Sequence, residues 1–574
     1  MTLHELLYSL ELGKGKAWMN KLLMAALIGV LSLWYLVSEF HGFKEREAMD
    51  AGQVGRQIAE GKGFTTQWIR PQAITLFQER LKSKSENKLE SFPEIYQAPL
   101  YPYILGGLFK MTGRPYEVSE AEMRDSPFRA EWVICFFNVL CTYLTALIIL
   151  VFGARLFDGR VGLLSSALFL VSNLIWSFSI SGLSTSLVML LLTASWFLLN
   201  EGMISQEKNR FQRMIAMIAV SGFVFGLSVL SRLSLIWVLI PMLLLSAVAF
   251  RTKLWVLFLY GIGFSVPVVP YLIRNYYLTG NVMGGWGSSN SMSDNEFCLL
   301  QSEQTFSYLK MVVIHMVQAA GHTMQNLQGI LGGSFAAILG FASVFHLFRR
   351  ERARIFQYGV FILLPFFVLG GSFVNAYPGL TSAWNMVVFV LPLLIICGAA
   401  FFYILLDRME LRHPMIAKTI IGLFIGLNAI PYLLTLAPPR EIPVRFPPYY
   451  PLIIKISTEW SEKNEVIVTD MPWATAWYGG RTSLWLPVKI KDLYWIHDYV
   501  SPLSAMLISP ITLDQKISEI KSPALIDYEK IVTRTGLPAN FPLTSVTGLP
   551  PKLGSGQEAY IYFSDSPRWM KKKE

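Results

Sequence analysis

The sequence predicts an α-helical polytopic membrane protein with a C-terminal α/β domain, and three observations lead to this fold class. Hydrophobic residues make up 53% of the 574 residues and charged residues only 15%, which is more apolar surface than a soluble fold of this size can bury. Repeated apolar stretches approach the roughly 18 to 20 residues that a helix needs to cross the hydrocarbon layer. The stretch "APPREIPVRFPPYYP" then separates these segments from a polar tail.

The apolar stretches indicate about 11 transmembrane helices. A membrane barrel would instead show alternating strands of about ten residues, and no such pattern is visible. The first stretch lacks a small-residue cleavage site, which is typical of an uncleaved signal anchor. The predicted spans are residues 19–40, 130–152, 161–179, 183–200, 214–231, 233–250, 254–273, 329–348, 355–374, 385–406 and 419–437.

Basic residues in the short loops predict the orientation of the chain, because such loops resist translocation. In the arrangement with 11 spans, six basic loops fall on one side, and the opposite short loops near 180 and 375–384 carry no basic residue. The N-terminus is therefore predicted to be cytoplasmic, and the loops 41–129 and 274–328 and the tail to be extracytoplasmic. The net charge of +10 is largely this signal, so nucleic acid is not an expected partner.

The chain is predicted to have two domains. Residues 1–437 form the transmembrane domain with its external loop 41–129, and residues 438–574 form the extracytoplasmic α/β domain. In the tail, "EVIVTDMP" and "SAMLISPI" predict strands, while 450–462 and 511–521 predict helices.

The external loop is predicted to hold two helices that lie in the membrane interface. In "DAGQVGRQIAEGKG" the apolar residues recur with helical period, and Gly61 and Gly63 end the helix. The segment "YQAPLYPYILGGLFKMTG" combines tyrosines with an apolar run that is too short to span. The first helix would expose its polar side chains to water, namely Gln53, Arg56, Gln57 and Glu60.

Asp50 is the candidate general base. It lies just beyond the first span, at the start of the first interfacial helix, where a carboxylate can deprotonate a hydroxyl acceptor at the membrane surface. Asp50 and Gln53 also have the spacing of a capping box, so Asp50 can alternatively cap that helix. Glu47 and Glu45 are the second candidates for the base, and each can equally be a solvated charge at headgroup level.

Three arginines at predicted external membrane boundaries are candidates for binding a donor phosphate. Arg232 in "SVLSRLSLIW" lies in a very short break between two spans, where an arginine is costly and usually has a partner. Phosphate suits it, because the guanidinium group binds phosphate bidentately. Arg70 in "QWIRP" and Arg274 in "YLIRNYYLTGN" can join the same site. Each arginine can alternatively be an anchor among lipid headgroups.

The sequence gives no positive indication of a metal or cofactor. His315 and His322 lack the spacing and the nearby carboxylates of a metal site and are predicted to be structural. Of the four cysteines only Cys298 lies in a predicted external loop, so no disulfide framework is visible. No phosphate-binding glycine loop or nucleophile elbow is present, so ATP-driven chemistry is not expected.

Four segments follow one another on the predicted external side: "EAMDAGQVGRQIAEGKGFTT", "QAPLYPYILGG", "RNYYLTGN" and "TDMPWATAWYGGRTSLWLP". In order and topological side they resemble the GT-C superfamily of membrane glycosyltransferases, and more closely its bacterial branch related to protein O-mannosyltransferases and aminoarabinose lipid A transferases. The first resembles the acidic first-loop motif of that family, and the second resembles its Pro-Pro-Leu-Tyr interfacial helix.

The resemblance implies a glycosyltransferase of the plasma (inner) membrane that transfers a hexosyl or pentosyl group. The donor would be a sugar on a polyprenyl phosphate, and the acceptor a lipid, glycan or protein. Asp50 matches the catalytic aspartate of the family, with Glu47 as second candidate. Gln97 and Tyr101 of the second segment become candidates for binding substrate, and membrane lipids are expected partners.

The sequence departs from the family pattern at two places, which keeps other functions open. Many relatives have a lysine before the Pro-Pro-Leu-Tyr element, where this chain has Gln97-Ala98-Pro99, so Arg70, Arg232 or Arg274 would have to contact the phosphate. Many also have an acidic residue in the second external loop, where "SISGLSTSL" offers only serines. A transporter or flippase of a lipid-linked saccharide and a catalytically silent assembly subunit are therefore the alternatives.

Overall fold

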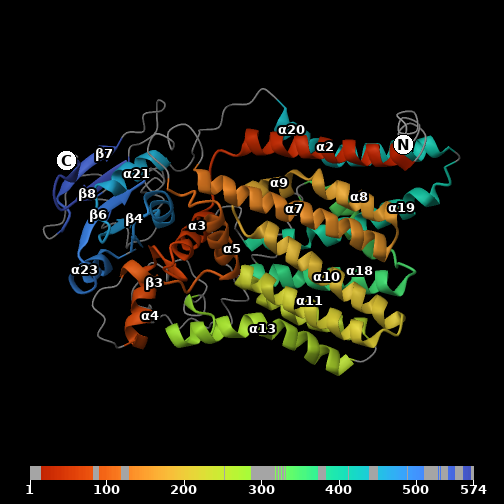
Figure 1. The fold of residues 1–574 in the computed structure, drawn as a ribbon, viewed down its shortest axis with the longest axis horizontal. Helices are drawn as coiled ribbons and strands as arrows, with labels where there is room; N and C mark the ends of the chain where they lie inside the picture. Colours follow the sequence, from red (N-terminus) through yellow and green to blue (C-terminus); the bar gives the residue numbers. More distant parts are fainter. Residues whose placement is uncertain are drawn as a thin grey trace.

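A computed structural model gives the fold of the chain. It describes residues 14–81, 89–117, 128–250, 253–285, 333–372, 383–437 except 412, 450–509 except 488, 541–549 and 560–570, with isolated residues between 317 and 331 and at 528 and 531. The molecule is elongated, with long helices at one end and a β-sheet at the other (Figure 1). Helices α3 (Arg46–Ala59) and α5 (Leu100–Met111) lie between the two parts.

The helical part belongs to a multi-pass membrane protein. Within the described residues six helices are long and apolar enough to cross a membrane, and there are up to seven if two helices that meet at a bend of 56° form one span. The bent pair is α8 (Gly159–Leu170) and α9 (Asn173–Ile180). The six are α7 (Arg129–Leu156), α10 (Thr185–Glu207), α11 (Phe211–Ser231), α13 (Lys253–Thr279), α19 (Leu391–Arg408) with the turn before it, and α20 (Pro414–Leu436).

The other predicted spans correspond to shorter or less apolar pieces, so the total of 11 passages stays a prediction. The predicted span 233–250 begins as the 3-10 helix η2 (Leu233–Val238) and continues as α12 (Leu239–Ala249). The predicted span 329–348 contains α17 (Phe335–Ala342) and the 3-10 turn η4 (Ser343–Phe345). The span 355–374 coincides with α18 (Glu351–Ser372), whose first turns are charged, and η5 (Ala383–Val390) precedes α19.

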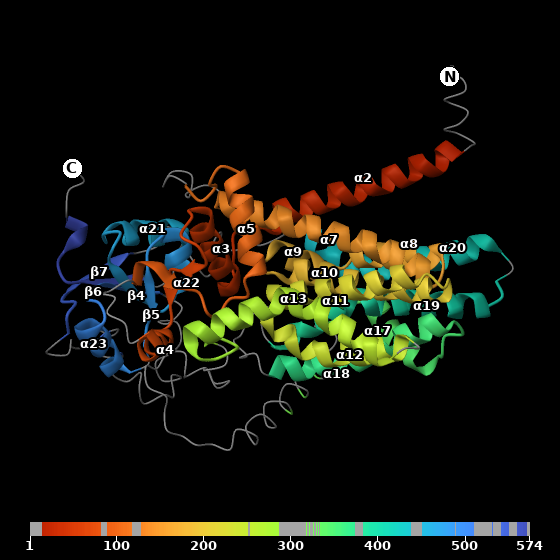
Figure 2. The same ribbon diagram turned by 60° about the horizontal axis from the view of Figure 1, so that its bottom comes forward.

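The first predicted span is α2 (Lys14–Glu39), which lies along the edge of the bundle. Its Tyr35 ring stacks on the Tyr432 ring of α20, with centroids 5.4 Å apart. Figure 2 shows that α2 diverges from the other helices toward its N-terminal end. Its attachment to the bundle is therefore concentrated near its C-terminal end, close to the segment that leads into α3.

Small residues bring the central helices of the bundle close together. A methyl group at Gly222 of α11 would clash with the Tyr260 carbonyl oxygen of α13, and one at Gly263 of α13 would clash with that of Ala219. Close backbone approach of this kind is how helices pack in lipid, where burial of apolar surface gives little driving force.

Basic residues from loops predicted to share one membrane side meet at the end of the bundle far from the sheet. Arg155 and Arg213 both pair with Glu201 of α10, at 3.7 and 3.3 Å. Arg352 lies 2.9 Å from Glu207, near the end of the same helix. These ion pairs support the predicted grouping of the basic loops, while the side of the membrane they face stays a prediction.

A six-stranded mixed sheet forms the core of the other end, in the order β2-β5-β4-β6-β8-β7. Neighbouring strands from β2 to β6 are parallel, whereas β8 pairs antiparallel with both β6 and β7. The predicted strands "EVIVTDMP" and "SAMLISPI" are confirmed as β4 and β6, and the helix 450–462 as α21, whereas 511–521 lies outside the described residues. The bounds are β2 (Trp68–Ile69), β4 (Val466–Thr469), β5 (Ser483–Trp485), β6 (Leu503–Ile508), β7 (Ser545–Leu549), β8 (Tyr560–Ser564), α21 (Pro451–Glu459) and α23 (Ile490–Tyr499).

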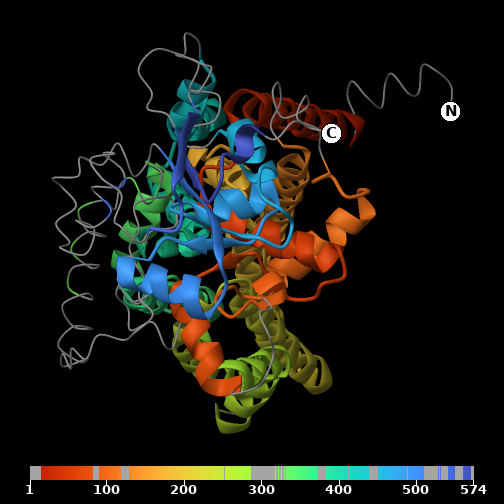
Figure 3. The same ribbon diagram turned by 90° about the vertical axis from the view of Figure 1, so that its left-hand side faces the viewer.

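Strand β2 belongs to the predicted external loop and not to the tail, so the first loop and the C-terminal domain share one sheet. The same loop forms α4 (Pro71–Leu81), the turn η1 (Leu89–Ser91) and a small pair of strands, β1 (Thr65–Thr66) with β3 (Phe92–Pro93). Figure 3 shows the loop and the tail side by side at this end. The boundary predicted at 437/438 stays a prediction, since 438–449 lies outside the described residues.

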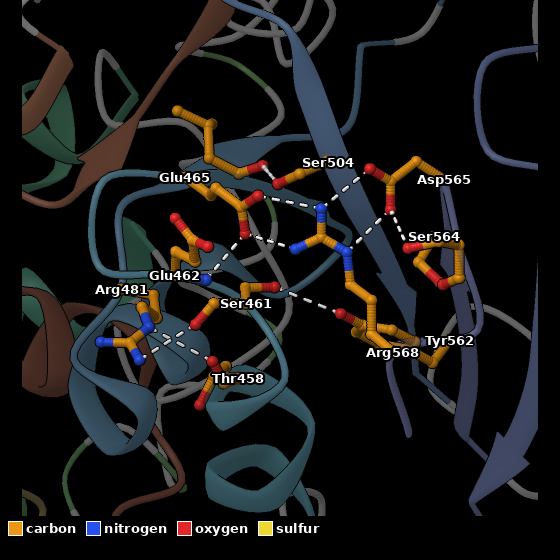
Figure 4. Close-up of polar contacts among 12 residues, drawn as sticks. Thr458, Ser461, Glu462, Glu465, Arg481, Ser504, Tyr562, Ser564, Asp565 and Arg568 are labelled. Atoms are coloured by element: carbon orange, nitrogen blue, oxygen red, sulfur yellow. Dashed lines mark hydrogen bonds and ion pairs between the residues drawn. The ribbon is translucent and has the colours of Figure 1, made fainter. Parts of the chain in front are cut away.

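The end of the chain is fastened to the C-terminal domain by one arginine (Figure 4). Arg568 begins the 3-10 helix η9 (Arg568–Met570) and donates to both carboxylate oxygens of Glu465 and both of Asp565. Close by, Arg481 donates to the carbonyl oxygens of Thr458 and Ser461, at 3.2 and 3.1 Å. Arg568 therefore joins the residue after β8 to the residue before β4, and Arg481 joins the loop before β5 to the end of α21.

Candidate active site

Helix α3 carries Asp50, and its environment corrects the prediction of an interfacial helix with a wet polar face. Gln53, Arg56 and Gln57 are buried, and of the four predicted polar positions only Glu60 is exposed. The prediction of a wet face was wrong because the tail covers Arg56 and the first loop's own residues Thr66 and Gln67 bond to Gln53. Helix α22 (Pro472–Ala474) and the π-helical turn η6 (Thr475–Gly479) pack on α3.

The contact between α3 and η6 is close and polar. The Trp477 ring lies where a methyl group on Gly52 would be, about 2.8 Å from that position. Arg56 donates to the Trp477 carbonyl oxygen at 3.0 Å, and also to the Ala476 carbonyl and to Gln67. A buried guanidinium is costly unless it is hydrogen-bonded, and both terminal nitrogens of Arg56 are bonded here. The tail thus fixes the helix that presents Asp50.

Asp50 does not cap α3. The helix begins at Arg46 and its N-cap is Glu45, so Asp50 lies within the helix, where backbone amides bond to the preceding turn. The capping-box alternative is therefore wrong. The predicted end of the helix is confirmed, because α3 stops at Ala59 and is followed by Gly61 and Gly63, both with positive φ.

The Asp50 carboxylate is fully buried and surrounded by donors. It accepts from Gln53 Nε2 at 2.9 Å and from Gln97 Nε2 at 2.7 Å, and the Arg70 guanidinium lies 3.6 Å away. Burial raises the pKa of Asp50 above its ordinary value, and Arg70 with the two amide donors partly offsets the rise. A carboxyl group with a raised pKa is a better proton acceptor once it is ionised.

Glu94 is a second buried carboxyl group beside Asp50, and the sequence analysis missed it. Its Oε1 accepts from the backbone N–H groups of Tyr96 and Gln97, at 2.6 and 2.8 Å. Burial first, and then the charge of Asp50, raise the pKa of Glu94. Gln97 joins the two groups, with its backbone on Glu94 and its side chain on Asp50. The only signal in the sequence was an acidic residue shortly before "YQAP".

Arg70 lies between two aromatic rings. Its Cζ is 3.9 Å from the centre of the Trp68 ring and 4.1 Å from that of Tyr96. A guanidinium group held over aromatic faces gains cation–π energy and loses freedom of motion. The positive charge of Arg70 is therefore fixed in position beside the Asp50 carboxylate.

A cavity of about 100 Å³ opens beside this cluster. Arg232 and Glu47 form an ion pair of 3.9 Å on its wall, and Arg70 and Arg46 add two more positive charges. Asp50 is not itself a lining residue and lies one layer behind Gln97 and Arg70. The lining residues are Arg46, Glu47, Ala51, Trp68, Arg70, Tyr96, Gln97, Ala98, Tyr101, Leu183, Ser184, Ser231, Arg232, Leu233 and Ser234.

The structure thus gathers most of the predicted site residues around one cavity. Tyr101 lines it, while its hydroxyl donates to the Gly182 carbonyl oxygen at 2.8 Å. Asp50 lies behind the lining residues, and Arg274 also does not line the cavity but donates to the Glu94 carbonyl oxygen at 2.9 Å. Their roles toward a substrate stay predictions. Within the described residues no three His, Cys, Asp or Glu side chains cluster as metal ligands would, and His315 and His322 lie outside that part.

Comparison with solved structures shows which fold this is. The chain is similar to ArnT from Cupriavidus metallidurans bound to undecaprenyl phosphate, with a TM-score of 0.55 and 10% identity over 97% of this chain and 99% of that one. The chain is also similar to the apo state of ArnT from the same organism, with a TM-score of 0.51 and 8% identity over 98% of this chain and 100% of that one. The Archaeoglobus fulgidus oligosaccharyltransferase tethered to an acceptor peptide is similar with a TM-score of 0.51 and 12% identity, over 86% of this chain and 69% of that one.

The chain has a GT-C fold. ArnT and the archaeal oligosaccharyltransferase are both GT-C membrane glycosyltransferases, so the resemblance predicted from four sequence segments is confirmed at the level of the fold. No protein-family model matches the chain, and no curated protein matches it in sequence. In this fold a buried carboxyl group, three arginines and a polar cavity meet next to the membrane helices, which is a combination suited to an anionic substrate and to proton abstraction.

Proposed function

We propose that this GT-C protein transfers a sugar from a polyprenyl-phosphate donor to a hydroxyl group of a lipid, glycan or protein acceptor. The observation that carries the proposal is the cavity, because Arg70 and Arg232 both line it and Arg70 lies 3.6 Å from the buried Asp50 carboxylate. The ArnT structure with bound undecaprenyl phosphate supports the choice of donor.

The arginines would bind the phosphate and stabilise the charge that it gains as it leaves. A polyprenyl phosphate leaves with increased negative charge, and preorganised positive groups in a site with little water stabilise that charge strongly. Arg70 is held by two rings and Arg232 by Glu47. Arg274 would contribute indirectly, because it holds the backbone at Glu94 and so the turn that carries Gln97.

Asp50 would accept the proton of the acceptor hydroxyl. The hydroxyl oxygen attacks the anomeric carbon, the bond from that carbon to the phosphate oxygen breaks, and the phosphate keeps the electron pair. The product would have inverted anomeric configuration. Because Gln97 lies between Asp50 and the cavity, its side chain would move aside when the acceptor enters. Glu47, on the cavity wall, is the second candidate for the base.

An apolar groove next to the cavity suits the prenyl chain of the donor. It has a volume of about 1130 Å³ and lies between α12 and α13. Leu233 and Ser234 line the cavity, and Leu239 and Ile240, shortly after them in the chain, line the groove. A phosphate at Arg232 could therefore continue into a lipid chain that lies in the groove. In this arrangement the helices make about 11 passages, the N-terminus is cytoplasmic, and the cavity and C-terminal domain are extracytoplasmic.

The experiment is sugar transfer in vesicles that contain the purified protein. Polyprenyl phosphates that carry different radiolabelled sugars are supplied with lipid, glycan and peptide acceptors. The proposal expects labelled acceptor together with free polyprenyl phosphate, and no transfer from nucleotide sugars. Label that changes leaflet while still attached to the polyprenol would instead indicate a transporter. Intact donor in its original leaflet with every acceptor would indicate a silent subunit.

A further inference from the structure

Trp68, which packs against the Arg70 guanidinium, is itself held by two tryptophans of the C-terminal domain. The Trp68 ring centre lies 5.3 Å from that of Trp473 and 5.4 Å from that of Trp485. Trp473 and Trp485 are 5.8 Å apart. All three pairs meet edge to face, which is a favoured geometry for aromatic rings. The three indoles therefore brace one another.

The backbone on either side of Trp68 is also bound by the C-terminal domain. Strand β2 is in parallel register with β5, with Trp68 opposite Ser483 and Ile69 opposite Leu484. The Ser483 N–H donates to the Gln67 carbonyl oxygen at 2.7 Å. Arg70 follows β2 directly, so the position of its backbone depends on a strand more than 400 residues away in the sequence.

We propose that Trp473 and Trp485 are positioning residues of the phosphate site, which they hold in place through Trp68 and Arg70. The C-terminal domain is then a structural part of the donor site and not a separate accessory module. The inference rests on the proposed function, because it takes Arg70 to contact the donor phosphate. Neither tryptophan lines the cavity, so each acts through Trp68.

The test is the affinity of the full-length protein for a polyprenyl phosphate without sugar, measured in detergent with a radiolabelled lipid. Trp485→Ala removes one of the two aromatic rings that contact Trp68, and Trp485→Phe keeps an aromatic ring at that position. Trp473→Ala is a second variant at a half-buried position, for the case that Trp485→Ala folds poorly. Trp495→Ala is the matched control, since Trp495 lies in α23 of the same domain and contacts Tyr499.

Trp485→Ala and Trp473→Ala should each weaken binding of the polyprenyl phosphate about tenfold. Without either ring Trp68 no longer holds the Arg70 guanidinium in place, and losing a positioned cationic group costs roughly that factor. Trp485→Phe should recover most of the affinity, and Trp495→Ala should match the wild type. In the transfer assay the donor KM should rise while the acceptor KM stays unchanged. If the wild type binds the lipid and folded Trp485→Ala and Trp473→Ala bind it equally well, the inference is wrong. If the wild type itself does not bind, the proposed function fails and the inference fails with it.

Discussion

At the scale of single residues, the site depends on how the charge of Asp50 is controlled. Burial disfavours the carboxylate, and Gln97, Gln53 and Arg70 favour it. The proposed base must be ionised to accept a proton, so these neighbours would decide the pH above which the proposed sugar transfer occurs. Because burial dominates, activity should be lost on acidification at a higher pH than an ordinary aspartate would give.

Gln97→Leu should shift the acid limb of the pH profile of kcat/KM for the acceptor to higher pH, because this profile reports the protein before the acceptor has moved Gln97 aside. The substitution removes the 2.7 Å hydrogen bond to the carboxylate, and this bond lowers the pKa of Asp50. Without it the carboxyl group ionises later as the pH rises. The measurement is the rate of sugar transfer at saturating donor and limiting acceptor as a function of pH.

Gln57→Leu is the control for this experiment. Gln57 lies on the same helix and is also buried, but its side chain has no hydrogen-bond partner among the described residues. Its pH profile should match that of the wild type. An acid limb that moves to lower pH in Gln97→Leu, or by the same amount in both variants, would contradict the role given to Gln97.

At the scale of elements, the turn η6 of the tail lies between the bundle and α3. On the bundle side, Glu131 in the first turn of α7 accepts from Trp477 Nε1 at 2.9 Å and from the Tyr478 hydroxyl at 2.7 Å. On the other side, Arg56 of α3 donates to the carbonyl groups of η6. The segment "PWATAWYG" is therefore the piece of the tail that holds α3, the helix of the proposed base, in place.

Arg56→Met should destabilise the protein by about 2 to 3 kcal/mol, because it leaves the buried carbonyl groups of Ala476 and Trp477 without a donor. The measurement is thermal or denaturant unfolding in detergent. Arg114→Met is the matched control. Arg114 is exposed and pairs with Glu117 at 3.3 Å, and an exposed pair of this kind contributes little. Equal losses in the two variants would show that η6 does not anchor α3.

The stability that η9 gains from its ion pairs with the C-terminal domain should depend on pH. Hydrogen bonds from Arg568 lower the pKa of Asp565 to about 2, and they also lower that of Glu465 against the opposing effect of its burial. A carboxyl group whose pKa is lower in the folded than in the unfolded protein stabilises the fold at pH values above its unfolded pKa, which is near 4. It loses that contribution as the pH falls toward 2.

Arg568→Gln tests this fastening. The difference in unfolding midpoint between wild type and Arg568→Gln should be constant above about pH 5 and should shrink as the pH falls below about 4. A difference that stays the same over the whole range, or grows on acidification, would mean that the ion pairs do not hold η9.

At the scale of the whole molecule, composition and hydropathy predict much of the fold, and local patterns predict part of the site. Apolar runs locate the long helices because lipid imposes a minimum length. Asp50, Arg70 and Arg232 could be proposed from their predicted topological side, and Gln97 from the family resemblance. The structure brings Gln97, Arg70 and Arg232 to one cavity, with Asp50 behind Gln97.

The rest of the site depends on contacts that no local pattern encodes. Strand β2 is two residues long, and only its partner β5 makes it a strand. The polar face of α3 has the pattern of a wet surface, but a segment more than 400 residues later covers it. Glu94 lies in a turn whose burial follows from the packing of α13 and the first loop around it, and so the sequence gives no reason to single it out.

The most direct test of the proposed function is sugar transfer by Asp50→Asn, measured at matched folded abundance with a polyprenyl-phosphate donor that the wild type uses. Asp158→Asn is the control, because Asp158 caps α8 and asparagine caps a helix equally well. We expect Asp50→Asn to lose at least about a hundredfold in rate, the usual contribution of a general base, and Asp158→Asn to keep the wild-type rate. Transfer by folded Asp50→Asn at the wild-type rate would remove Asp50 from the mechanism and contradict the central claim.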